Sequence, residues 1–254
     1  TYGICLLGRI CMKRKLVRKI TGLALTLGIT VSIGAAVSAH GVYFADRLDT
    51  PTLVLGEGPY DNAYQPSMVT ALDGYSVTGA PMTVDVKKHA SNITIQKSDT
   101  LGRTVTFFDY GHFTKDASGT MHAFKTFAEV PNAVKTTHAI KYNIHYWQPE
   151  TIPTAIDSVP IQIIPSVNPL TLRKGDTFTI QVLKDGKPYS HAPLIGDVIN
   201  DLTNESEADE HGRATLTVHA NGLNVIGVEV ALPTDDPHTQ NKYFSSLSFI
   251  IDPE

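Results

Sequence analysis

The run His138-Ala139-Ile140-Lys141-Tyr142-Asn143-Ile144-His145-Tyr146-Trp147 alternates apolar and polar residues. Successive side chains of a strand point to opposite faces, so one apolar face would carry His138, Ile140, Tyr142, Ile144 and Tyr146. The opposite face carries Lys141, Asn143 and His145, and we expect His145 to be solvated there. This period of two predicts a long β-strand with one buried face.

Shorter runs of the same kind recur along the chain, separated by turn residues every eight to twelve positions. That spacing is typical of a sandwich or barrel. The expected strands are Thr52–Leu55, Met82–Val86, Asn92–Gln96, Thr104–Asp109, His138–Trp147, Val159–Ile164, Thr177–Leu183, Ala214–Val218, Asn224–Val230 and Tyr243–Ile251. We therefore expect an all-β fold of two immunoglobulin-like β-sandwich domains. A polar stretch around Gln148 to Val159, with two prolines, predicts the boundary. The expected domains are residues 40–157 and 158–254.

The N-terminal residues 1–39 have the three parts of a secretory signal peptide. Met12 looks like the true start because a basic segment follows it, and Ile20 to Val37 is apolar. Val37-Ser38-Ala39 supplies the small residues that cleavage requires. The alternative is an uncleaved membrane anchor, but the apolar run is rich in small residues and barely reaches spanning length. We expect cleavage before His40 and a mature protein in the periplasm that does not span the membrane.

Charge and cysteine content narrow the possible partners. Six of the 21 basic residues and none of the 25 acidic residues lie in residues 1–39, which leaves residues 40–254 with a net charge of −10. Such a chain repels nucleic acid and anionic lipid and favours cations. Both cysteines, Cys5 and Cys11, precede the expected mature chain, so imidazole and carboxylate are the natural metal ligands.

An ordered series of motifs in residues 40–254 resembles one family. In the C-terminal half it comprises Val159-Pro160-Ile161-Gln162-Ile163-Ile164-Pro165, Leu172-Arg173-Lys174-Gly175-Asp176, Val182-Leu183-Lys184-Asp185-Gly186-Lys187-Pro188, Ala208-Asp209-Glu210-His211-Gly212-Arg213-Ala214 and Gly222-Leu223-Asn224-Val225-Ile226-Gly227. The N-terminal half adds Ala39-His40, Tyr60-Asp61-Asn62-Ala63-Tyr64-Gln65-Pro66 and Glu129-Val130-Pro131-Asn132-Ala133. The chain is similar to the periplasmic component of cobalt and nickel uptake systems, a domain-of-unknown-function family. The resemblance implies a two-part β-sandwich associated with nickel or cobalt import. One departure is Gly56-Glu57-Gly58, where relatives carry a histidine nearby. Glutamate there would shift metal preference toward harder ions.

The sharpest metal-ligand hypothesis is His40. After cleavage its α-amine and its imidazole Nδ1 could chelate one ion, and an α-amine titrates near ~8, so a cation displaces its proton readily. Nickel and cobalt, and also copper and zinc, suit such nitrogen donors. The alternative is that cleavage merely leaves a histidine at a flexible end.

Five further residues are candidate ligands. His138 begins an apolar strand face, where an imidazole needs a partner, which could be a metal or a backbone carbonyl. His112 and His122 flank a turn-rich loop and could close over an ion, although surface decoration would also explain them. Glu57 and Asp61 bracket a Gly-Pro turn and could supply oxygen ligands.

The sequence contains no metalloprotease zinc motif, no serine-hydrolase nucleophile motif and no phosphate-binding loop. We therefore expect that the protein is not an enzyme. The function that we expect is a periplasmic accessory that captures a divalent ion, most readily nickel or cobalt, and passes it to a membrane transporter. The alternatives are an exported structural or ligand-binding β-sandwich and, less favoured, a copper enzyme with an N-terminal histidine brace.

Overall fold

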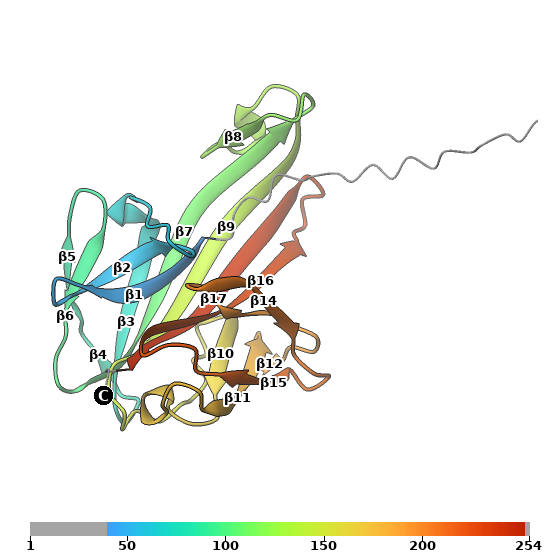
Figure 1. The fold of residues 1–254 in the computed structure, drawn as a ribbon. Helices are drawn as coiled ribbons and strands as arrows, with labels where there is room; N and C mark the ends of the chain where they lie inside the picture. The colour runs from blue at the N-terminus through green and yellow to red at the C-terminus, as the bar shows by residue number, and fades with distance from the viewer. Residues whose placement is uncertain (1–39, 252–254) are drawn as a thin grey trace, which may run out of the picture. The chain divides into compact units, whose positions relative to one another are not determined.

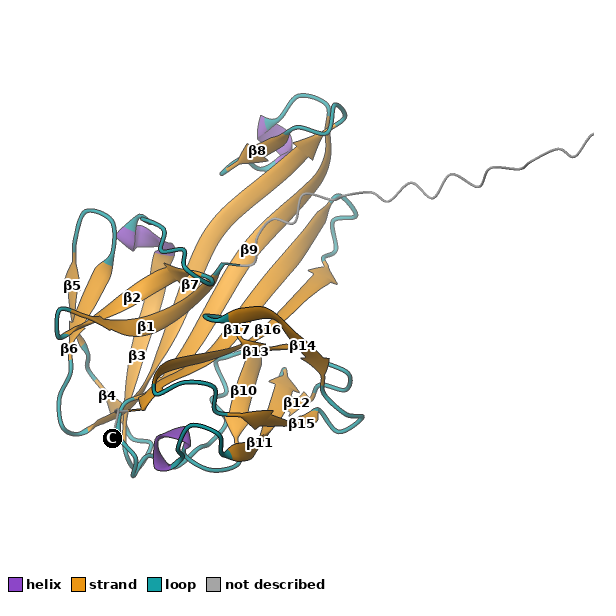
Figure 2. Cartoon of the chain, in the orientation of Figure 1, coloured by secondary structure: helices purple, strands orange, loops and turns teal. Residues whose placement is uncertain are grey.

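The computed structural model describes residues 40–251, and the expected signal peptide lies outside the described residues. The strands are β1 (Gly41–Arg47), β2 (Thr50–Gly56), β3 (Val69–Ser76), β4 (Pro81–Met82), β5 (Asp85–Lys88), β6 (Ile93–Gln96), β7 (Leu101–Asp116), β8 (Met121–Ala123), β9 (Ala133–Tyr146), β10 (Ile161–Pro165), β11 (Thr177–Lys184), β12 (Lys187–Pro188), β13 (Pro193–Asp197), β14 (Asp201–Glu207), β15 (Arg213–Thr217), β16 (Gly222–Pro233) and β17 (Thr239–Ile251). Three short 3₁₀ helices accompany them: η1 (Pro66–Met68), η2 (Phe127–Glu129) and η3 (Pro169–Thr171). Within residues 40–251 no helix is long and apolar enough to cross a membrane. The expected all-β fold is confirmed (Figures 1 and 2).

The strands form three sheets. The central sheet has the order β14-β13-β16-β17-β9-β7-β3-β4, with β8 paired to β7. The N-terminal sheet is β1-β2-β6-β5, and the C-terminal sheet is β10-β11-β12 with β15 on β11. Figure 1 shows the long strands β7 and β9 extending beyond both smaller sheets to the β8 hairpin.

The expected domain boundary at residues 157/158 lies between β9 and β10, but one sheet contains strands from both sides of it. Strand β17 pairs with β9 in parallel from Thr239 opposite Thr136 to Phe249 opposite Tyr146. Long antiparallel pairing of β7 with β9 and of β16 with β17 completes the middle of the sheet. The two halves of the chain therefore share the central sheet.

Both faces of the central sheet are covered, which makes three layers. The N-terminal sheet packs Phe44 and Leu53 against Phe108 and Trp147. On the opposite face, the C-terminal sheet packs apolar residues such as Ile163 against a group of central-sheet residues: Ile144, Tyr146, Leu247 and Phe249. Burying a large apolar side chain in this way contributes about 1.5–3 kcal/mol.

The covered second face corrects one sequence prediction. His145, expected to be solvated, is 1% exposed, and its neighbours Lys141 and Asn143 are also buried. The alternating pattern reveals one apolar face but cannot show that β1 lies over the polar one. Hydrogen bonds satisfy part of these polar groups: Asn143 Nδ2 donates to the hydroxyls of Ser246 and Ser248, and Ser246 Oγ donates to the Val42 carbonyl of β1.

Candidate metal site

Strands β7 and β9 place two of the expected ligands side by side. His112 and His138 are directly opposite in the antiparallel register. Their rings are stacked, with centroids 4.1 Å apart and planes 7° from parallel. Directly opposed residues in an antiparallel pair have Cβ atoms ~5 Å apart, which is close enough for both to reach one ion. The structure therefore brings His112 and His138 together, although they are 26 positions apart in the sequence.

An irregularity in β7 adds a carboxylate to this pair. The register of β7 against β9 shifts between Asp109 and Gly111, where Gly111 has a φ of 93°. Glycine adopts that left-handed conformation without a Cβ clash, so the bulge is tolerated there. The Gly111 amide donates to Asp109 Oδ1 at 2.9 Å, which fixes the carboxylate beside the histidines.

Asp109 then determines which nitrogen of His138 is available. His138 Nε2 lies 2.8 Å from Asp109 Oδ1, and a neutral imidazole that donates from Nε2 keeps a lone pair on Nδ1. Histidine ligands of metals usually donate their second ring N–H to a carboxylate, which orients the ring and increases its basicity. Asp109 was not among the residues selected from the sequence; the Asp-Tyr-Gly that forms the bulge was the available signal.

The environment of His112 disfavours protonation of its ring. Partial burial is the main cause that lowers the pKa of His112, and the neighbouring His138 lowers it further. Protons and metal ions compete for the same lone pair, so a lowered pKa favours metal binding at neutral pH.

The other expected ligands lie elsewhere. His122 Nε2 is 2.8 Å from Asp116 Oδ2 across the β7–β8 hairpin, and this contact is the largest cause that lowers the pKa of Asp116. Asp61 forms an ion pair with Arg47. The six expected ligands therefore do not gather into one site, and within residues 40–251 no group of three or more His, Cys, Asp or Glu is placed to hold a metal.

Strand β1, which begins directly after His40, packs on the face of β9 that carries His145, and alternation puts His138 on the opposite face. Gly41 of β1 pairs with Gly56 of β2. His40 directly precedes Gly41, and Glu57 directly follows Gly56. Glu57 is buried, and the Lys141 ammonium interacts electrostatically with it. Burial lowers the pKa of Lys141 to about 8, so this lysine is still mainly protonated at neutral pH. A cation next to Glu57 disfavours a second cation there.

A separate pH effect follows from the burial of His145. Its burial, with a smaller contribution from the Lys97 ammonium, lowers the pKa of His145 from 6.5 to about 3. Between these two values the unfolded chain binds a proton that the folded chain does not, so stability is lost as the pH falls from about 6.5 to about 3.

We therefore expect His145→Gln to lose less unfolding free energy than the wild type between about pH 7 and about pH 4.5. Urea unfolding at both pH values measures the difference. His211→Gln, which alters an exposed histidine, should lose as much as the wild type. Equal losses in all three proteins would contradict the assignment to His145.

The fold and this arrangement define an all-β protein of three stacked sheets with a histidine pair on the projecting part of its central sheet. Comparison with known proteins places the chain in a family: residues 37–231 match the domain of unknown function DUF4198, and the chain belongs to that family. No curated protein matches. Among solved structures, the D0-D1 domain of intimin is 16% identical, with a TM-score of 0.17, over 81% of this chain and 92% of that one.

Proposed function

We propose that this chain is a periplasmic protein that captures a divalent transition-metal ion for nickel or cobalt uptake, and that His112 and His138 hold the ion. The observation that carries the proposal is the opposed, stacked pair of imidazoles with Asp109 bonded to one of them. The resemblance to cobalt and nickel uptake components, the expected signal peptide and the acidic composition of residues 40–254 support the same role.

The donor set suits a cargo site. Two neutral imidazole nitrogens prefer borderline ions such as nickel, cobalt, copper and zinc. Two protein ligands leave the remaining coordination positions to water or to a partner's ligands, and this would let an ion pass to a membrane transporter. Because lone pairs lie in the ring planes, binding would turn the His112 ring out of the stack toward the ion, while Asp109 keeps the orientation of His138.

This proposal separates the histidine pair from the N-terminal amine of His40. We expect the mature chain, with His40 at its terminus, to bind one nickel ion, and the affinity to stay within about twofold when one residue is added before His40. The amine is then no longer α to the histidine, so a site built on it would lose its chelate ring. Calorimetric titration of both proteins with nickel, cobalt, copper and zinc makes the comparison.

A large loss of affinity in the extended protein would instead place the ion at His40. Failure of both proteins to bind any of the four ions would favour the alternative, an exported structural or ligand-binding module without a metal role.

A further inference from the structure

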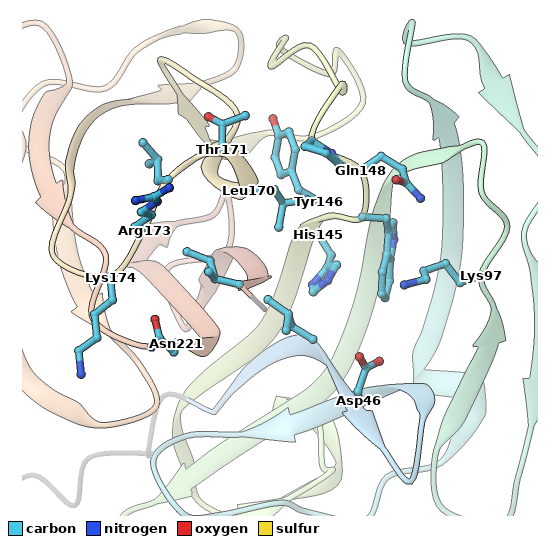
Figure 3. A pocket seen from close by; sticks show the side chains of 15 residues that line it. Asp46, Lys97, His145, Tyr146, Gln148, Leu170, Thr171, Arg173, Lys174 and Asn221 are labelled. Carbon is cyan, nitrogen blue, oxygen red and sulfur yellow. The ribbon is translucent and has the colours of Figure 1, made fainter. Parts of the chain in front are cut away.

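A cleft of about 790 Å³ lies at the end of the central sheet opposite the β8 hairpin. It is bounded by the end of β9 and the residues after it, by the 3₁₀ helix η3 with the residues that follow, and by the end of β17. Its volume is within the usual range of about 300–1,000 Å³ for small-molecule sites. Figure 3 shows Lys97, His145 and Gln148 toward one end of the cleft and Arg173, Lys174 and Asn221 toward the other.

The charge of the cleft is opposite to that of the chain. Among the residues that the structure describes, Lys97, Arg173 and Lys174 line it, together with one acidic residue, Asp46. Residues 40–254 as a whole have a net charge of −10. A positively lined concave surface on an acidic protein concentrates anions and repels the cations that the rest of the surface attracts.

The remaining lining offers apolar surface on a rigid support. Leu170, Leu172 and Ile250 contribute aliphatic side chains. The Trp147 ring packs on the buried imidazole of His145 at 4.0 Å, and its Nε1 donates to Thr104 Oγ1 at 3.1 Å. The Lys97 ammonium lies 5.9 Å from the Trp147 ring centroid. A charged group next to apolar walls favours a ligand that has both a group of opposite charge and an apolar part.

We propose that this cleft binds a small organic anion, in which a carboxylate pairs with Lys97 and an apolar body lies against Leu170 and Ile250. Lys174 adds long-range attraction at the far end. The proposal is independent of the metal site, because the cleft shares no residue with the histidine pair.

The fluorescence of Trp147 tests it directly, since Trp147 is the single tryptophan of the chain. We expect benzoate and hexanoate to change this fluorescence saturably, and the neutral analogues benzamide and hexanamide to change it much less. Added salt should weaken the binding because it screens the ammonium groups. Lys97→Gln should weaken it about tenfold, the loss expected for one charge-assisted contact.

Lys187→Gln is the matched control, because Lys187 is exposed on β12 and does not line the cleft. Lys97 is itself exposed, so its substitution should leave the fold intact, and circular dichroism checks that. Equal responses to the acids and their amides, unchanged affinity in Lys97→Gln, or no response to either acid at about 10 mM would each overturn the proposal.

Discussion

His138→Ala is expected to bind nickel at least about 100-fold more weakly than the wild type, because losing a ligand should cost no less than the 10–100-fold typical of losing its supporting group. The variant removes the Nδ1 donor and the partner of the Asp109 carboxylate at once. Both side chains are partly exposed, so we expect the fold to survive the change. Calorimetric titration at neutral pH measures the loss.

Asp109→Asn adds a finer test of the same geometry. It keeps the size of the side chain but removes the charge that orients His138, so we expect a loss of about 10–100-fold. His211→Ala alters a well-exposed histidine in a turn far along the sequence and should bind nickel as the wild type does. Wild-type affinity in His138→Ala would remove the histidine pair from the site.

Phe44→Ala is expected to have the largest effect on stability, a loss of about 3–5 kcal/mol in the free energy of unfolding. Phe44 is fully buried between the N-terminal and central sheets. Its ring contacts His145 and Trp147 edge-on, at centroid distances of 5.8 Å and 5.2 Å. Truncation leaves a cavity at the point where the two layers meet.

Urea unfolding monitored through Trp147, which contacts Phe44, measures this loss. Leu48→Ala is the control, because Leu48 is fully exposed in the turn after β1 and its truncation should change stability by less than about 0.5 kcal/mol. A loss below about 1 kcal/mol in Phe44→Ala would mean that β1 does not cover the face of β9. The three-layer packing would then be wrong.

The sequence predicts the class of the fold well and its layering poorly. The alternation in residues 138–147 identifies β9 and its apolar face, and the all-β class follows from similar runs. Strands β1, β3, β8, β12, β13 and β14 were not predicted; β14, for example, is mostly exposed, so no apolar face marks it. The parallel pairing of β9 with β17 joins residues about a hundred positions apart, and no local pattern encodes such a contact.

The candidate site shows the same division. His112 and His138 were selected from the sequence for separate reasons: His112 flanks a turn-rich loop, and His138 begins an apolar strand face. Only the β7–β9 register shows that they are opposed, and only the bulge at Gly111 brings Asp109 to them. Burial of His145 was missed because the polar face of β9 is covered by a strand, β1, that was not predicted.

The location of bound nickel tests the metal proposal most directly. Crystals of the mature chain soaked with nickel, measured at the nickel absorption edge, would show where the ion lies. We expect one anomalous peak about 2.1 Å from a ring nitrogen of both His112 and His138, with the His112 ring turned out of the stack. A peak beside His40 and Glu57, or no ordered peak in the presence of saturating nickel, would contradict the histidine pair as the capture site.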